Sequence, residues 1–460
     1  MKNDLISSKK HARTNASAWK AVVAKYQQPA VWRSALQLVN TLVPYVALWY
    51  LIYLALPVSY WLTAPLMLLA AGFLVRIFII FHDCGHGSFF KSRRANDVVG
   101  CIAGVLCLTP YFHWRWEHAL HHSTSGDLDR RGTGDVWTLT VQEYLAASRW
   151  KRFAYRLARN PFVLFLIAPC FLFVIRERFP TAGAGKRERR SVYWTNLGIL
   201  AVGGGLSLVF GLKAYLIIQL VVVAVAASAG VWLFYVQHQF EGVYWERGEN
   251  WDYVTAALKG SSFYRLPRVL QWFSGNIGFH HIHHLSPRIP NYYLPKCHAA
   301  EPLFQTVKPV TLLSSLKSLT FRLWDERRRK LVGYRALKRV RHWGVFAFQE
   351  RSRRVISIPD LSVRVELQPA KEQVWMRLEG TLSPSSAEGL GQRLRDSLAR
   401  SRSRLVLDLD RLHWDKVSDL RPLREQLAAY RSRIRLIVPK LAAAHPEVIL
   451  LAGMFQHYKG

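Results

Sequence analysis

Residues 275–294 read GNIGFHHIHHLSPRIPNYYL and place His280, His283 and His284 at positions i, i+3 and i+4. On a helix these positions share one face, so the three imidazole rings can converge on a metal ion. A single histidine-rich turn is more often a solvated surface than a metal site. The interpretation therefore depends on whether the same spacing occurs elsewhere in the chain.

Two upstream segments repeat this spacing, and they read His82-Asp-Cys-Gly-His86 and His118-Ala-Leu-His121-His122. Together the boxes hold more imidazoles than the four ligands that one zinc ion takes. Neutral imidazole is a good ligand for iron, and an iron site can leave coordination positions open for O2. Soluble carboxylate di-iron proteins use Glu and Glu-x-x-His pairs instead. An all-histidine set therefore predicts two iron ions in a membrane oxygenase.

The composition also indicates a membrane protein. The chain has 460 residues, with 63 Lys and Arg against 30 Asp and Glu, a formal net charge of +33 and 50% hydrophobic residues. A nucleic-acid-binding protein would explain the charge but not the long apolar runs, whereas a membrane protein with basic cytoplasmic faces explains both. We therefore expect the membrane, and no nucleic acid, as a partner. The five cysteines lack paired spacing, which favours a reducing compartment.

Four apolar runs have about the length that crosses a ~30 Å hydrocarbon core. They are Ala35–Leu56, Trp61–Phe81, Val192–Phe210 and Ala214–Val236. Because the connection within each pair is short, we predict two hairpins of membrane-spanning helices. The runs Val98–Phe112 and Pro161–Ile175 have only 15 residues each, and we expect them to form interfacial or re-entrant helices.

The positive charges predict the topology. Residues 1–34 contain seven Lys and Arg and residues 176–190 contain six, while the two hairpin connections contain one between them. Basic segments favour the cytoplasmic side. With four crossings, both termini and a histidine-rich cap share that side, and we expect the bacterial inner membrane. Residues 1–34 have no early apolar core, so we expect no signal peptide.

The C-terminal part has a different pattern. The basic segment 310–343 would form either a solvated helix face or a docking surface for anionic lipid or an acidic electron donor. Beyond it, predicted strands alternate with predicted helices, which indicates a small α/β domain. The strands are expected at 374–378, 405–409 and 434–438, and the helices at 385–399, 420–430 and 447–451. The predicted organisation is a cytoplasmic segment at 1–34, a membrane domain at 35–345 and the α/β domain at 355–460.

Residues 36–343 resemble the membrane fatty acid desaturase family through the boxes HDCGH, WRWEHALHH and GFHHIHHLSPRIPNYYL. Within that family the boxes are most similar to those of the acyl-lipid ω6/Δ12 and ω3 branch. The resemblance implies two iron ions that activate O2 and remove two hydrogens from a methylene pair of an acyl chain. It also implies electrons from ferredoxin or cytochrome b5.

The resemblance assigns iron ligands by position: His82, His86, His118, His121, His122, His280, His283 and His284. A further family ligand follows the last spanning helix, where this chain has His238. The alternative for His238 is an interfacial histidine held by hydrogen bonds. In the doublet at 280–281 the alignment makes His280 the ligand and leaves His281 beside the site or facing solvent.

Ligating imidazoles need an acceptor for their other N–H group. The acids that lie close to the boxes in sequence are Asp83, Glu117, Asp127, Asp129 and Asp135. Each is a candidate acceptor and would otherwise be an ordinary surface acid. Asn276 precedes His280 by four residues, and it would either orient a water or an imidazole or cap a turn.

The chain departs from the family pattern in two places. It has no HPGG-type haem motif, since residues 443–446 read AAHP, so the electrons are expected from a separate ferredoxin-like or cytochrome b5-like protein. The tail at 374–455 resembles a STAS domain, which implies a protein partner. Where that family often has DSSG this chain has KVSD at 416–419, and an interaction module is favoured over a phosphosite at Ser418.

These features lead to one main hypothesis and two alternatives. The main hypothesis is an O2-dependent desaturase that introduces a cis double bond, ω6/Δ12-like, into a lipid-linked acyl chain. A related di-iron hydroxylase or ketolase acting on a carotenoid or another lipid would carry the same ligand set. A sensor of lipid or iron that signals through the tail without turnover is the alternative from another class, and the complete boxes disfavour it.

Overall fold

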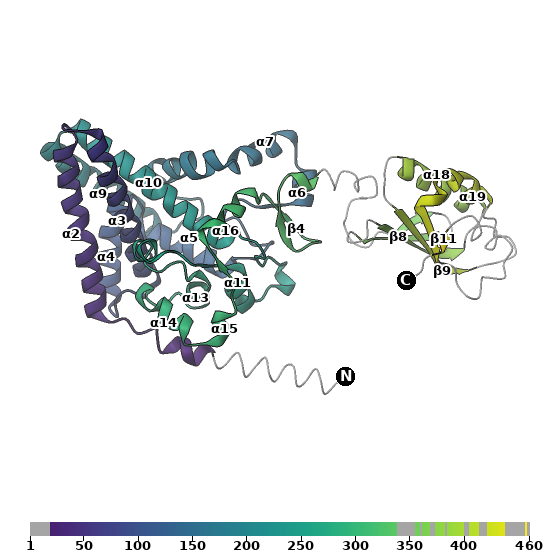
Figure 1. Cartoon of the computed structure of the whole chain (residues 1–460), viewed down its shortest axis with the longest axis horizontal. Helices are drawn as coiled ribbons and strands as arrows, with labels where there is room; N and C mark the ends of the chain where they lie inside the picture. The colour runs from purple at the N-terminus through teal and green to yellow at the C-terminus, as the bar shows by residue number, and fades with distance from the viewer. Residues whose placement is uncertain are drawn as a thin grey trace. The chain divides into compact units, whose positions relative to one another are not determined.

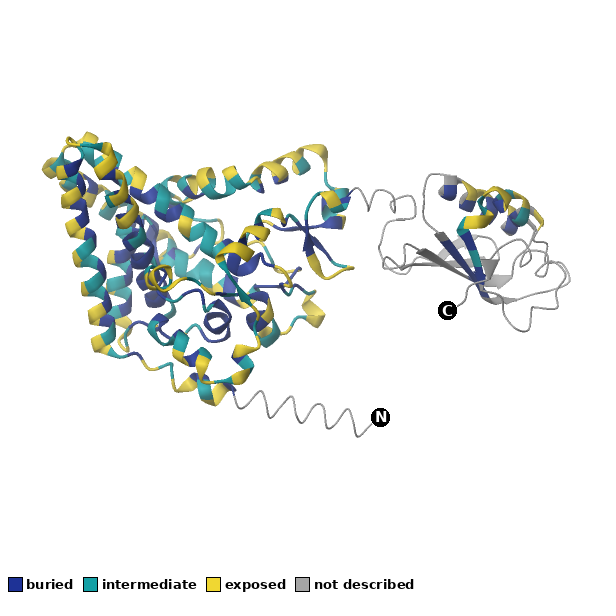
Figure 2. Ribbon diagram, in the orientation of Figure 1, coloured by how far each residue is buried: buried dark blue, intermediate teal, exposed yellow. Residues whose placement is uncertain are grey.

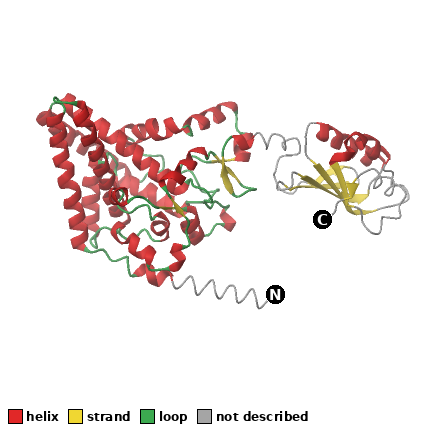
Figure 3. Ribbon diagram, viewed as in Figure 1, coloured by secondary structure: helices red, strands yellow, loops and turns green. Residues whose placement is uncertain are grey.

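The computed structural model describes residues 19–337 continuously and, further on, 355–358, 361–368, 373–381, 384–399, 404–413, 421–437 and 456–457. The chain divides into two compact units, Met1–Gly333 and Tyr334–Gly460 (Figure 1). The first unit is mostly helical and the second combines helices with a sheet (Figure 3).

Four helices of the first unit are long and apolar enough to cross a membrane, as the sequence predicts. They are α2 (Val31–Ala55), α3 (Tyr60–His86), α9 (Lys186–Phe210) and α10 (Leu212–His238). Helix α3 packs against α2 and α10, and α10 packs against α9. Within the most apolar window of each helix, 56% of the residues of α3 are buried, whereas only 17% of those of α9 are. Helix α3 therefore lies at the centre of the four helices (Figure 2). The pairing as hairpins and the side of the membrane stay predictions.

Helix α3 extends beyond the apolar run that predicted it. The Ser59 hydroxyl caps its start by accepting from the Trp61 amide. The helix passes Phe81 and stops at Gly87, whose φ of +67° ends the helical hydrogen bonding without the steric cost of a side chain. The helix is therefore longer than the apolar run Trp61–Phe81 and includes the polar residues that follow it. The first histidine box forms the last turn of this long helix.

The two shorter apolar runs belong to bent helix pairs. Helices α4 (Arg93–Leu106) and α5 (Tyr111–Thr124) meet at 100°, at a break that ends in Pro110. Gly104 allows this close turn, because an added Cβ would lie 2.5 Å from the carbonyl oxygen of Thr109. Helix α7 (Arg149–Ala158) meets the segment Val163–Arg178 at 61°. The chain would cross six times if each pair were one span, so the predicted interfacial placement stays a prediction.

Short elements complete the first unit. The helices are α6 (Val141–Ala146), α8 (Ala168–Cys170), α11 (Tyr253–Gly260), α12 (Arg268–Phe273), α13 (His280–Leu285), α14 (Leu294–Ala299), α15 (Pro302–Gln305) and α16 (Leu312–Ser315). Strand β1 (Leu139–Thr140) joins β4 (Leu323–Asp325) and β5 (Lys330–Val332), and β2 (Phe263–Tyr264) pairs with β3 (Pro309–Val310).

The basic segment after the third box is not one helix face in its described part. Residues 326–329 form the turn between β4 and β5. In this turn Arg328 lies 3.7 Å from a carboxylate oxygen of Asp325, and Arg329 lies 3.2 Å from one of Glu246. Of the two alternatives, the solvated helix face is wrong for residues 323–332, because β4 and β5 pair as antiparallel strands there. Part of the positive charge is matched by local acids.

A buried cation, Arg76, links three helices of the first unit. It lies within the apolar length of α3 and is 7% exposed. Its Nε donates to the Thr41 hydroxyl at 3.0 Å, and its guanidinium lies 3.9 Å from the centre of the Trp272 ring. The side chain therefore faces the helix bundle. It connects α2, α3 and α12 through one buried cation.

The second unit contains a six-stranded sheet in the order β11-β10-β9-β8-β7-β6. Its strands are β6 (Val355–Ile358), β7 (Leu361–Gln368), β8 (Gln373–Thr381), β9 (Arg404–His413), β10 (Ile434–Ile437) and β11 (Gln456–His457). The first three strands pair antiparallel and the others parallel. Helices α18 (Pro384–Ala399) and α19 (Arg421–Leu427) lie between strands in the chain.

The elements predicted for the tail at 374–378, 385–399, 405–409, 420–430 and 434–438 fall within or overlap observed ones. Strands β6 and β7 were not predicted, although the alternation in LSVRVELQ indicates a strand. The motifs at 416–419 and 443–446 and the helix expected at 447–451 lie outside the described residues. The likeness to a STAS domain stays a prediction.

Candidate metal centre

Nine histidines from four separate helices gather at one place in the first unit. Helix α3 contributes its last turn, α5 its second half, α10 its final residue and α13 its first two turns. Gly275 and Asn276, which precede helix α13, adopt left-handed φ values of +51° and +59° and form a turn before it. The three boxes and His238, which are distant in sequence, thus become neighbours.

The first cluster contains five of these histidines, and their nearest ring nitrogens all lie within 4.8 Å of one another. They are His82, His86, His118, His122 and His283. Nε2 of His122 lies 3.1 Å from Nε2 of His118 and 3.0 Å from Nε2 of His283. Each of the three boxes therefore contributes at least one histidine to the first cluster.

The second cluster contains His121, His238 and His284, also within 4.8 Å. Nε2 of His238 lies 3.2 Å from Nε2 of His121 and 3.0 Å from Nε2 of His280. His280 therefore joins this cluster as a fourth ring. The structure brings together all nine histidines that the sequence and the resemblance singled out.

The protonation state of these rings suits metal binding. Burial, strengthened by the neighbouring histidines, holds the pKa of His118, His122 and His283 well below the ordinary value of 6.5. The same holds for His280 and His284. Neutral imidazole is the form that ligates metals.

Some ring nitrogens of the clusters have no hydrogen-bond partner among the described residues. Nε2 of His86 and Nε2 of His284 are buried without any hydrogen bond among the described residues. Where two neutral imidazoles face each other through Nε2, at most one carries a proton, so a lone pair remains directed into the cluster. Buried acceptors without donors are unfavourable, and two cations would satisfy them.

Two of the predicted acids contact the clustered rings. Asp135 places Oδ1 2.8 Å from Nδ1 of His121, and Asp83 places Oδ1 3.3 Å from Nδ1 of His82. Each contact fixes which nitrogen of the ring faces the cluster. The indole of Trp114, which the sequence did not single out, stacks on His118 with ring centres 4.3 Å apart.

The other predicted neighbours point elsewhere. The Glu117 carboxylate accepts from the Thr181 hydroxyl at 2.5 Å. Asp127 accepts from Arg130 Nε at 2.6 Å, and Asp129 accepts from the Gly248 amide at 3.0 Å. Each of these acids accepts a hydrogen bond from a donor outside the histidine clusters. Proximity in sequence to a box was therefore not sufficient to predict contact with it.

His281 and Asn276 also lie outside the clusters. Nε2 of His281 faces Nδ1 of His298 at 3.1 Å. The Asn276 side chain donates to the carbonyl oxygen of Asn291 at 3.2 Å and so holds its own turn, the second of the two roles considered for it.

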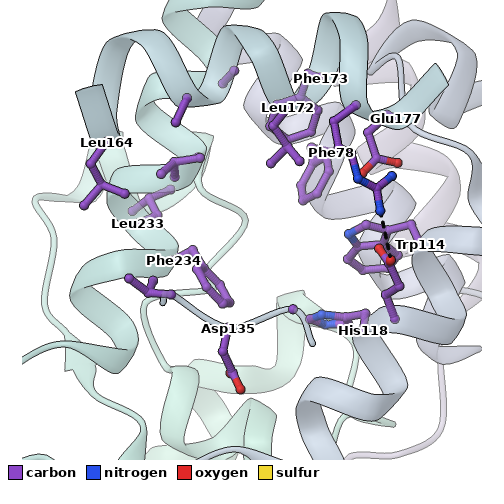
Figure 4. Close-up of a pocket in the computed structure, with 18 of the residues that line it drawn as sticks. Phe78, Trp114, His118, Asp135, Leu164, Leu172, Phe173, Glu177, Leu233 and Phe234 are labelled. Atoms are coloured by element: carbon purple, nitrogen blue, oxygen red, sulfur yellow. Dashed lines mark ion pairs between the residues drawn. The ribbon is translucent and has the colours of Figure 1, made fainter. Parts of the chain in front are cut away.

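A pocket of about 750 Å³ opens beside the clusters (Figure 4). His82, His118 and His280 line it, and most of its remaining wall is apolar. The sequence did not predict this wall, because its residues come from α3, α5, α10 and the segments 132–137 and 158–181, which are distant in sequence. An apolar pocket of this size next to the clustered histidines is suited to a hydrocarbon chain.

Comparison with known proteins agrees with this geometry. The family described as "Fatty acid desaturase" matches residues 59–311. A "Fatty acid desaturase" of Bacillus subtilis (strain 168) is 52% identical over 318 residues, which cover 69% of this chain and 90% of that protein.

More distant relatives point to the same family. An "Omega-3 fatty acid desaturase, chloroplastic" of Brassica napus is 30% identical, over 53% of this chain and 62% of its own. An "sn-1 acyl-lipid omega-3 desaturase (ferredoxin)" of Synechocystis sp. is 28% identical, over 54% and 68% respectively. Because the family match spans more than half of the 460 residues, this chain belongs to the fatty acid desaturase family and is an oxidoreductase.

Proposed function

We propose that the protein is an O2-dependent di-iron desaturase that introduces a cis double bond into an acyl chain of a membrane lipid. The observation that carries this proposal is the pair of buried histidine clusters beside an apolar pocket. In the reaction two C–H bonds of neighbouring methylenes break and a C=C bond forms. O2 takes up those two hydrogens, two electrons and two protons and becomes two molecules of water.

Each cluster would hold one iron ion, which supplies the O2-dependent oxidation of an unactivated C–H bond. The protein's own residues then have three tasks. The histidines hold the ions through neutral nitrogens, Asp83 and Asp135 fix the ring orientations, and the apolar wall excludes water and positions the chain. No carboxylate belongs to either cluster within the described residues, which distinguishes this donor set from that of soluble carboxylate di-iron proteins.

The partners follow from the same proposal. The electrons would come from a separate ferredoxin-like or cytochrome b5-like protein, and one relative carries "ferredoxin" in its name. The protein would reside in a bacterial inner membrane with the histidines and both termini on the cytoplasmic side. The domains at 1–34, 35–345 and 355–460 would be a cytoplasmic segment, the desaturase and a STAS-like module that binds a protein partner.

Fatty-acid analysis of cells that lack polyunsaturated lipids tests this proposal. Cells that express the protein are expected to contain a new cis-unsaturated acid, dienoic if the ω6/Δ12-like specificity holds. Gas chromatography with mass spectrometry of disulfide adducts locates the bond. A hydroxylated or oxidised lipid in its place would make the enzyme a hydroxylase or ketolase. An unchanged profile, with iron bound and a competent donor supplied, would favour a sensor.

Removing the acceptor of His121 is expected to weaken iron binding. In Asp135→Ala the imidazole N–H at 2.8 Å loses its partner, and the iron affinity should fall about 10- to 100-fold because the ring is no longer oriented. Titration with a competing chelator measures this change. Asp129→Ala is the matched control, since Asp129 bonds the Gly248 amide and not a clustered ring. Equal iron retention in both variants would contradict the role of Asp135.

A further inference from the structure

Glu177 is a buried acid in the wall of the pocket. Its residue is 6% exposed, and it lies in the short 3-10 turn Arg176–Arg178 that ends the bent segment. Its Oε2 has no hydrogen-bond partner among the residues that the structure describes. The carboxyl group nevertheless lines the pocket. Such a group costs free energy unless something else satisfies it.

The charges around Glu177 do not neutralise it. Glu117 on α5 contributes a second negative charge, while Arg176 and Arg178 on its own turn oppose it. The Arg176 guanidinium lies 3.8 Å from the Glu117 carboxylate and is thus directed towards the other acid. Burial, together with the charge of Glu117, raises the pKa of Glu177 to about 7. A large share of the protein therefore carries a neutral carboxyl group that can donate an O–H.

The position of Glu177 suits one end of a bound acyl chain. Figure 4 shows Glu177 beside Phe173 on one side of the pocket, while Leu164 and Leu233 lie on the opposite side. In Figure 4 His118, which belongs to the first cluster, lies below Glu177 on the same side of the pocket. Asp135, which contacts His121 of the second cluster, lies at the lower edge between the two sides. A chain with its polar end near Glu177 and its hydrocarbon towards Leu164 would therefore pass the histidine clusters.

We propose that Glu177 binds the carbonyl oxygen of the acyl ester and thereby sets the distance between the carbonyl group and the new double bond. The carbonyl oxygen is an uncharged acceptor that accompanies every ester-linked acyl chain, and a neutral carboxyl group is its natural donor in an apolar wall. This inference rests on the proposed function, because it identifies the polar group of the same substrate.

A comparison of ester and ether lipids tests the contact without requiring turnover. Purified protein in detergent is incubated, without an electron donor, with equal amounts of dipalmitoyl phosphatidylglycerol and its dialkyl ether analogue, which lacks the carbonyl oxygens. Native mass spectrometry then measures how much of each lipid is retained. Wild-type protein is expected to favour the ester by about 3- to 10-fold, the range for one hydrogen bond.

Two variants of similar volume decide whether Glu177 is responsible. Glu177→Gln keeps a hydrogen-bond donor and should keep the ester preference, whereas Glu177→Leu should bind ester and ether equally. The leucine variant is expected to fold, because it replaces an unpartnered buried acid by an apolar group. Glu249→Leu, at an exposed position, is the control and should behave as wild type. Undiminished ester preference in Glu177→Leu would overturn the proposal.

The position of the product double bond gives a second readout. With palmitoleoyl and oleoyl chains, which the ω6/Δ12-like enzyme would convert to dienoic chains, wild-type enzyme should place the new bond at the same distance from the carbonyl carbon, and Glu177→Leu should give a mixture of positions. A constant distance from the methyl end would overturn the inference while leaving desaturation established. If no chain is desaturated, the proposed function fails, and the lipid retention ratio still reports on Glu177 alone.

Discussion

Replacing His121 by alanine is expected to leave the protein in the membrane, to remove one of the two proposed iron ions and to abolish the new double bond. His121 belongs to the smaller cluster, where its Nε2 lies 3.2 Å from that of His238. The remaining rings of this cluster would offer too few ligands to retain the ion. Because loss of a mere supporting partner costs about 10- to 100-fold in metal affinity or activity, loss of a ligand should cost more.

Iron content by plasma mass spectrometry and fatty-acid analysis of expressing cells measure the two effects. His281→Gln is the control, because His281 lies in the third box but faces His298 at 3.1 Å. Glutamine keeps much of the volume and a donor, so iron and activity should remain near wild type. Full activity in His121→Ala would refute the ligand assignment, and iron loss in His281→Gln would shift the ligand of the doublet from His280 to His281.

Features that depend on local sequence were predictable. The i, i+3 and i+4 spacing of the boxes and the four apolar windows follow from helical periodicity alone. His238 was different, because no other histidine lies three or four residues from it in the sequence. Only the resemblance to a family indicated it as a ligand. The structure brings it within 3.0 Å of His280, at the end of α10.

Features that depend on contacts between distant segments were not predictable. The partner of Asp83 is Asn291, which lies 208 residues away. Glu177 sits in the sequence RER and reads as part of a solvated basic stretch. It is buried in the folded protein, where its turn Arg176–Arg178 packs against α9. The 100° bend between α4 and α5 was not predicted within the run Val98–Phe112, because Pro110 indicates a possible break but not its angle.

The contact between Asp83 and Asn291 carries the second large expected effect. One carboxylate oxygen of Asp83 accepts from the Asn291 amide at 2.7 Å and from its side-chain nitrogen at 2.8 Å. The other oxygen lies 3.3 Å from His82. The side-chain oxygen of Asn291 accepts from Gln37 at 3.2 Å. This buried network fastens the first box on α3 to the segment after the third box and to α2.

Asp83→Ala is therefore expected to lower the free energy of unfolding by about 3 kcal/mol, since two buried donors lose a charged acceptor. Iron affinity should fall about 10- to 100-fold as well, because His82 loses its partner. Thermal unfolding and chelator titration in detergent separate the two effects. Asp83→Asn keeps the volume and one acceptor, so its losses should be smaller. If Asp83→Ala retained wild-type stability and lost only iron, the carboxylate would orient His82 without holding the boxes together; the reverse result would make it a purely structural tie.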